Sequence, residues 1–111
     1  MVNEYLQAAG FVLGKTYRHS RFPSPPTGKT YAIYSDDITL LGPDLRPGLV
    51  RRHNVTVEMY EPEPDDAIEA AFEGVLDVAG IEWEKQDRYW LREEQRYQTI
   101  YEFSYIEKRR E

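Results

Sequence analysis

Residues 49–80 read LVRRHNVTVEMYEPEPDDAIEAAFEGVLDVAG, and this stretch joins a strand pattern directly to a helix pattern. In its first part, Val55, Val57 and Met59 alternate with more polar side chains. Alternation with a period of two is typical of a strand that buries one face. We therefore expect a strand over residues 49–60, ended by the proline-containing turn at residues 61–66.

A helix is predicted to follow that turn. Pro64 suits a first helical turn, the nearby acidic side chains favour the positive end of the helix dipole, and Asp66 and Glu69 have the spacing of a capping box. One apolar stripe then recurs at helical spacing and stops at Gly80. Its members are Ile68, Ala71, Phe72, Val75, Leu76 and Ala79. The stripe predicts a helix packed on one face of a sheet.

Further elements are predicted on both sides of this stretch. Strands are expected over residues 15–22, 30–38, 81–90 and 95–107, and a short N-terminal helix is expected to begin at Asn3, bury Leu6 and Ala9, and end near Gly10. The order α-β-β-β-α-β-β predicts an α+β fold. It consists of a mainly antiparallel sheet of about five strands, with the amphipathic helix on one face and the short helix beside it.

The remaining segments are expected to be connections within a single domain over residues 1–111. They are the proline-rich residues 23–28, a long loop at residues 39–48 and a charged tail at residues 107–111. No apolar run approaches the roughly 20 residues that cross a membrane, and no signal-peptide pattern is present. We therefore expect a soluble protein without a membrane partner.

The charge of the chain is unevenly distributed. The net charge is −6, yet residues 1–56 contain 7 basic and 4 acidic side chains, whereas residues 57–111 contain 7 basic and 16 acidic ones. The chain has no cysteine, which excludes a disulfide framework, a thiolate metal site and a thiol nucleophile.

No motif predicts catalysis, so we expect a protein that is not an enzyme and has no cofactor or metal. His19 and His53 fall on different predicted strands, and no spacing motif places them on one face with Asp36 and Asp37. We expect strand-surface histidines and a pair of aspartates that initiates a turn. The acidic residues 58–69 do not have the spacing of a calcium loop.

Aromatic side chains on several strands, together with Arg51 and Arg52, raise the possibility of a nucleic-acid surface. The negative net charge opposes phosphate, and the RNP-type signature is missing. We therefore expect no sequence-specific nucleic-acid partner, and we expect one aromatic row to be core beneath the helix.

Opposite charges on different parts of one small domain favour head-to-tail self-association, although a solvated surface of mixed charge explains them equally well. Arginine and tyrosine, both frequent here, are enriched at interface hot spots, which favours the interface. The predicted interface combines a basic and an acidic set. They are Arg18, Arg21, Arg46, Arg51 and Arg52, and Glu82, Glu84, Asp87, Glu93 and Glu94.

Residues 30–105 also contain a series of recognisable segments. These are YAIYSDD at residues 31–37, VTVEMY at residues 55–60, a turn and helix with Glu69 and Leu76, Gly80-Ile81, an aromatic and acidic strand through Tyr89, and EQRYQTIYEF at residues 94–103. In this pattern the chain resembles the tail terminator, tail completion or minor capsid-type proteins from the head–tail joining region of long-tailed phages and prophages.

The resemblance implies a structural role. Tail terminators form a hexameric ring on the head-proximal end of the tail tube, stop its polymerisation and dock to the neck of the head. The implied partners are further copies of the chain, the major tail tube protein and the head-neck connector proteins. The implied location is the head–tail interface of the virion, after assembly in the host bacterial cytoplasm, and an acidic lumen would let DNA slide through. The resemblance carries no catalytic residues.

Two kinds of alternative stay open. In the same class, the protein is another neck component, such as a head-completion or tail-to-head joining protein. In another class, it is a small-ligand or peptide-binding α+β domain, or a remote enzyme that uses His19, His53, Asp36 and Asp37.

Overall fold

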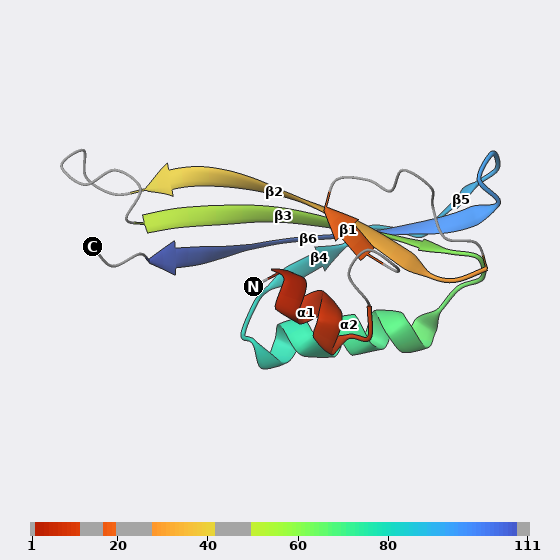
Figure 1. Cartoon of the computed structure of the whole chain (residues 1–111), viewed down its shortest axis with the longest axis horizontal. Helices are drawn as coiled ribbons and strands as arrows, with labels where there is room; N and C mark the ends of the chain where they lie inside the picture. The colour runs from red at the N-terminus through yellow and green to blue at the C-terminus, as the bar shows by residue number, and fades with distance from the viewer. Residues whose placement is uncertain (1, 12–16, 20–27, 42–49, 109–111) are drawn as a thin grey trace.

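A computed structural model describes residues 2–11, 17–19, 28–41 and 50–108 and shows an α+β fold. Two helices, α1 (Val2–Ala8) and α2 (Asp66–Val78), lie on one face of a six-stranded sheet (Figure 1). The strands are β1 (Tyr17–His19), β2 (Tyr31–Leu41), β3 (Val50–Glu61), β4 (Trp83–Lys85), β5 (Tyr89–Leu91) and β6 (Arg96–Lys108).

The sheet has the order β1-β2-β3-β6-β4, and β5 also pairs with β6. Strand β1 runs parallel to β2, whereas the other described pairs are antiparallel. The predicted fold class is thus confirmed, with one strand more than expected. The described helices include none long and apolar enough to cross a membrane.

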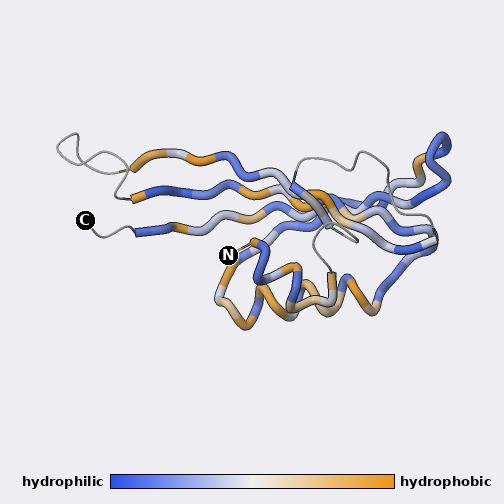
Figure 2. The backbone as a smooth tube through the Cα atoms, viewed as in Figure 1, coloured by the Kyte–Doolittle hydropathy of each residue, from blue (hydrophilic) through white to orange (hydrophobic). Residues whose placement is uncertain are grey.

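The core lies between the helices and the middle of the sheet. Val55, Val57 and Met59 of β3 are buried, as their alternation predicts. Phe72 of α2 packs against Tyr101 of β6 with ring centroids 5.3 Å apart in an edge-to-face arrangement. Figure 2 shows apolar residues recurring along both helices and along the strands. The aromatic row beneath the helix is therefore core, as expected.

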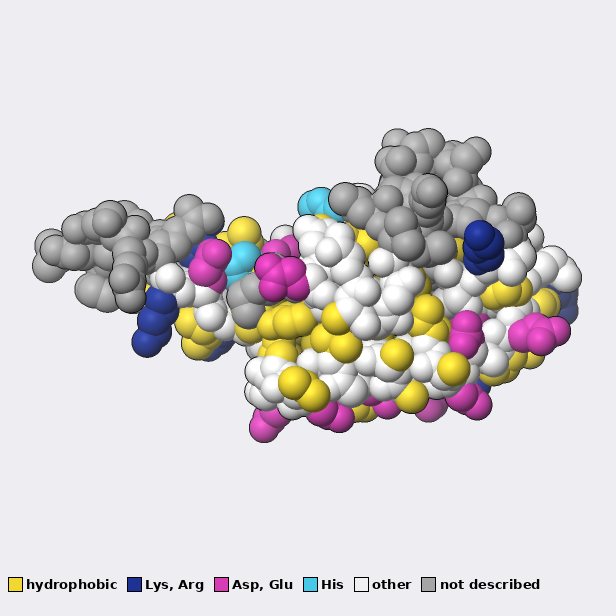
Figure 3. All heavy atoms as spheres, turned by 60° about the horizontal axis from the view of Figure 1, so that its bottom comes forward, with side chains coloured by type: hydrophobic (Ala, Val, Ile, Leu, Met, Phe, Trp, Pro, Cys, Tyr) yellow, Lys and Arg dark blue, Asp and Glu magenta, His cyan; other side chains and the backbone are white. Residues whose placement is uncertain are grey.

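Three strands are much longer than their neighbours, and together they form a projecting arm. Strands β2, β3 and β6 contain 11, 12 and 13 residues, whereas β1, β4 and β5 contain three each. We define the arm as residues 37–41 of β2, 50–54 of β3 and 104–108 of β6, which lie side by side in register. It extends beyond the helices and gives the molecule its dimensions of 50 × 29 × 23 Å (Figures 1 and 3).

The arm overturns three expectations about loops. Residues 39–41 belong to β2 and not to the long loop, whose remainder lies outside the described residues. Asp36 and Asp37 lie within β2 and do not initiate a turn. Glu107, which the predicted strand and the predicted tail shared, belongs to β6, and Lys108 extends the strand into the expected tail. The physical reason is shared, because the length of β3 offers backbone partners to both flanking strands.

Both helices begin differently from the prediction. Helix α1 starts at Val2, and Asn3 uses its side-chain oxygen to accept a hydrogen bond from the Tyr17 hydroxyl (3.0 Å) instead of capping the helix. Helix α2 is capped by Asp65, which accepts from the Ile68 amide at 3.2 Å, and not by Asp66. In α1 a tertiary hydrogen bond thus occupies the expected capping side chain, whereas in α2 the cap lies one residue earlier than predicted.

The burial of the helix residues agrees with the prediction at some positions and differs at others. Leu6 and Ala9 are buried as expected. In the apolar stripe of α2, Ala71 and Ala79 are exposed, which corrects the prediction at those two positions.

The predicted strand over residues 81–90 is wrong, because it divides into β4 and β5. Between them, the Gln86 amide donates to the Ile100 carbonyl at 2.9 Å. Of the first predicted strand, the structure describes only β1, and the proline-rich residues 23–27 lie outside the described residues.

Candidate assembly interface

The two edges of the sheet carry the predicted interface residues of opposite charge. Strand β1 forms one edge and contains Arg18, while β4 forms the opposite edge and contains Glu84, with Glu82 immediately before it. A basic and an acidic member of the predicted interface thus lie at opposite sides of one sheet. This is the placement that head-to-tail contact between copies requires.

Of the other described interface residues, only Asp87 shares one of these edges, because β4 and β5 both pair with β6 on the side opposite β3. Arg51 and Arg52 lie in β3, the middle strand of the arm, and Asp87 lies between β4 and β5. Glu93 and Glu94 occupy the turn between β5 and β6, at the end of the sheet remote from the arm (Figure 1). Arg21 and Arg46 lie outside the described residues. The acidic set thus runs from the β4 edge to the β5–β6 turn, whereas Arg51 and Arg52 lie away from the β1 edge.

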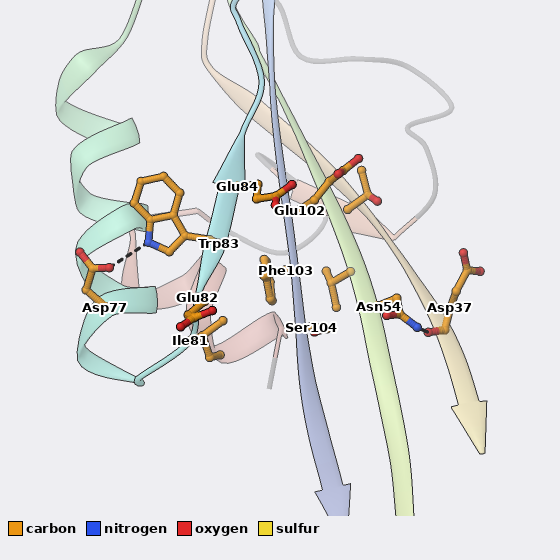
Figure 4. A pocket seen from close by; sticks show the side chains of 12 residues that line it. Asp37, Asn54, Asp77, Ile81, Glu82, Trp83, Glu84, Glu102, Phe103 and Ser104 are labelled. Atoms are coloured by element: carbon orange, nitrogen blue, oxygen red, sulfur yellow. Dashed lines mark hydrogen bonds between the residues drawn. The ribbon is translucent and has the colours of Figure 1, made fainter. Parts of the chain in front are cut away.

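A groove of about 860 Å³ opens at the β4 edge, where β6 continues beyond Trp83 (Figure 4). Its described lining includes five acidic side chains and no lysine or arginine. They are Asp37, Asp77, Glu82, Glu84 and Glu102. The groove repels anions such as DNA phosphates and favours a cationic partner.

Two acidic residues of this groove face each other across the strand pair. Glu84 of β4 lies directly opposite Glu102 of β6, and like charges in that position are destabilising. The side-chain amide of Gln86 donates to Glu102 at 3.1 Å, and the Trp83 indole donates to Asp77 at 2.8 Å. Neutral donors hold the carboxylates in place but leave their charge uncompensated.

A second hollow, of about 480 Å³, lies beside the groove against residues 79–82 and 104–106. The two hollows share Ile81, Glu82 and Ser104. Space therefore borders β6 at the root of the arm, where β4 no longer covers its edge.

His53 holds the three strands of the arm together. It lies on the middle strand, where its Nδ1 is 2.7 Å from Asp36 of β2 and its Nε2 is 3.2 Å from Glu107 of β6. Its ring stacks on Tyr105 with centroids 4.5 Å apart and planes 7° apart. Because both neighbours are carboxylates, which accept hydrogen bonds, the ring binds both at once only as an imidazolium.

The surroundings of His53 favour this charged form. Burial lowers the pKa of His53, but the hydrogen bonds that its ring donates to Asp36 and Glu107 outweigh burial and raise the pKa above 6.5. The expectation of a surface histidine is wrong here, because His53 is buried.

His19 is in a different setting, stacked on Tyr34 with ring centroids 4.8 Å apart. The structure thus gives the two histidines separate partners. In the described ranges, no group of three or more His, Asp or Glu side chains has the geometry to hold a metal ion.

We expect the arm to lose stability as pH rises. His53 has a raised pKa in the folded state, so its contribution is complete below pH 6.5 and disappears as pH rises through the raised pKa. Amide hydrogen exchange of residues 50–54 and 104–108 should therefore accelerate above that pH, after correction for the intrinsic rate. H53Q should flatten this dependence, whereas H19Q should leave it unchanged. Equal pH profiles for the wild type and H53Q would show that the contacts of His53 with Asp36 and Glu107 do not stabilise the arm.

Two buried carboxylates, neither of which was among the predicted site residues, connect α2 to the sheet. Glu61, at the end of β3, accepts from the Asp65 amide and from the Thr99 hydroxyl, both at 2.7 Å. Glu69 of α2 is 2.6 Å from Lys85 Nζ and 2.7 Å from Arg88 Nη2. The network joins β3, α2, β6, β4 and the segment between β4 and β5.

The two carboxyl groups differ in charge. Burial, followed by the hydrogen bond with Glu69, raises the pKa of Glu61 to about 7. Burial also opposes ionisation of Glu69, but its hydrogen bonds with Glu61, Lys85 and Arg88 lower the pKa of Glu69. Glu69 thus holds the negative charge, whereas Glu61 keeps its proton at pH values well above the ordinary pKa of a glutamate side chain.

One signal in the sequence pointed to this network. Glu69 falls at i, i+3 and i+7 with Phe72 and Leu76, which places it on the buried face of α2. The capping-box interpretation assigned it to the helix start instead.

Comparison with known proteins adds no family, since no protein-family model matches the chain and no curated protein matches it.

Proposed function

We propose that this protein is a structural subunit of the head–tail connection of a long-tailed phage or prophage. It acts as a tail terminator, forming a hexameric ring that caps the tail tube, stops its polymerisation and docks to the neck of the head. The resemblance over residues 30–105 supports this biological setting. The placement of charge on the two sheet edges supports the ring itself.

The observation that carries the proposal is the opposition of β1 and β4 across one sheet. In the ring, the β4 edge of one copy, with Glu82 and Glu84, meets the β1 edge of the next, which contains Arg18. Arg21 follows Arg18 three positions later in the sequence. Such a contact joins unlike surfaces, so it repeats from copy to copy and closes when the rotation allows. Because the β1 and β4 edges carry opposite charge, electrostatic attraction also favours contact between unlike edges over contact between like edges.

Capping follows from the shape of the ring. One end of the ring binds the last tube subunits, while the other end presents different elements and offers no site for a further tube ring. The acidic groove, which repels phosphate, is consistent with DNA passing such a ring without being retained. The partners are thus the tail tube protein and the neck proteins, and the location is the virion.

Charge reversal at one edge tests the ring. E82K/E84K should reduce self-association at least tenfold, because two like edges then face each other, and raising the salt concentration from 0.1 to 1 M should weaken the wild-type ring. Adding R18E/R21E to E82K/E84K should restore it. E93K/E94K, with the same change in charge at the remote turn, is the matched control and should assemble normally. Sedimentation velocity at micromolar concentrations measures each result.

A second experiment tests the place of the ring in the phage. The protein should co-sediment with purified tail tubes and not with tailless, DNA-filled heads. Binding to heads alone would assign it to another neck component. If the protein stays monomeric at all concentrations and binds neither tubes nor heads, the proposal is rejected, and a ligand-binding α+β domain becomes the better interpretation.

A further inference from the structure

Within the described part of the chain, both outer strands of the arm have an open edge. Strand β1 pairs with β2 only at residues 32–34, and β4 pairs with β6 only at residues 101–103. Among the described strands, residues 37–41 of β2 and 104–108 of β6 therefore pair on one side only, with β3. The described pairing thus reaches Tyr34 at the β1 edge and Phe103 at the β4 edge, both before the arm begins.

These edges carry apolar side chains that solvent reaches. Ile38 and Leu40 of β2 are 48% and 58% exposed, and Ile106 of β6 is 53% exposed. Residues 37–41 contain no proline and one charged residue, Asp37, and the charges of residues 104–108 are confined to Glu107 and Lys108 near the tip. Soluble proteins usually protect strand edges with proline and charged side chains, so edges with few of them are suited to pairing with another chain.

The direction of the strands restricts how two arms can join. Strands β2 and β6 are both antiparallel to β3, so they run in the same direction, toward the tip of the arm. A symmetric dimer through like edges would cover one edge of each copy and leave the other open. A single repeated contact covers both edges in every copy only if it joins unlike edges. Copies related by rotation with their arms side by side then bring β6 against β2 in parallel.

We propose that the arms of neighbouring copies form one continuous sheet, in which residues 104–108 of β6 pair in parallel with residues 37–41 of β2 of the next copy. This inference rests on the proposed ring and names the strands that close it. Within one copy, Asn54 pairs with Asp37 on one side and with Ser104 on the other. His53 likewise pairs with Ile38 and with Tyr105. Between copies at the same height, Ser104 therefore lies beside Asp37, and Tyr105 covers Ile38. The hollows beside Ser104 leave room for the added strand.

Engineered cysteines test this pairing cleanly because the chain has none of its own. In D37C/S104C, the two positions of one copy are separated by β3, about 9–10 Å apart from the spacing of strands. That distance exceeds the limit of about 7 Å between Cα atoms for a disulfide, so a bond can form only between copies. Both side chains are exposed, and the variant should therefore fold like the wild type.

Mild oxidation of D37C/S104C should produce a ladder of covalent oligomers that ends at the size of the ring. Each single variant should remain uncrosslinked, and an equal mixture of D37C and S104C should give covalent dimers only. D37C/E94C, with one cysteine moved to the remote turn, is the control and should give no ladder. D37C/I106C and T39C/S104C detect a register shifted by two residues in either direction.

Three results would overturn the pairing. If the wild type forms a ring but none of the three pairs crosslinks, the arms do not join and the proposed function survives. If D37C or S104C crosslinks efficiently with itself, like edges meet and the contact is a symmetric dimer. If the wild type is monomeric and does not bind tail tubes, the ring and the pairing are rejected together.

Discussion

The double variant K85M/R88M should unfold with a free energy lower than that of the wild type by about 3–5 kcal/mol. Lys85 and Arg88 are the two cations that contact Glu69, whose side chain is only 2% exposed. Their removal leaves a buried negative charge without compensation, which costs far more than the loss of a surface ion pair. Urea denaturation at pH 7 measures the difference.

Two further variants show whether the buried charge is responsible. E69Q in the K85M/R88M background should recover part of the lost stability, because the side chain is then neutral. R92M removes an exposed arginine and should change the free energy of unfolding by less than about 0.5 kcal/mol. A loss below about 1 kcal/mol for K85M/R88M would show that Glu69 is not ionised in the folded protein.

Replacement of Phe72 by alanine should destabilise the protein by about 3–5 kcal/mol. Phe72 is fully buried and contacts Tyr101 and Phe103, so its removal leaves a cavity between α2 and the sheet. Thermal and urea unfolding measure the effect.

Val78 provides the matched control on the same helix, because it is 91% exposed. V78A should change the free energy of unfolding by less than about 0.5 kcal/mol. Equal effects of F72A and V78A would mean that α2 does not bury its predicted face.

The sequence was sufficient for the elements whose pattern is local. Alternation at Val55, Val57 and Met59 and helical spacing at Phe72 and Leu76 each lie within one segment, so the buried faces of β3 and α2 could be predicted. The extension of β2 to Leu41 could not, because it depends on backbone partners that a different strand supplies. Pairing between distant segments has no local signature.

The candidate interface was predictable only in part, for the same reason. Composition identified Arg18 and Glu84 as charged residues, but their position at opposite edges is a consequence of strand order. His53 was misassigned because Asp36 and Glu107 are 17 and 54 residues away in the chain. Glu93 and Glu94 were grouped with Glu84 by their shared charge, although the β5–β6 turn places them at the far end of the sheet.

The orientation of the arm has one more consequence. The arm tip and the β5–β6 turn lie at opposite ends of the long axis (Figure 1). If copies assemble by rotation about an axis with their arms all pointing the same way, that axis is polar: one rim displays arm tips, with Arg51, Arg52 and Lys108, and the other displays Glu93 and Glu94. An assembly of one protein species would then offer two chemically distinct rims. One partner protein could bind the basic rim and another the acidic rim, without a second kind of subunit in the ring.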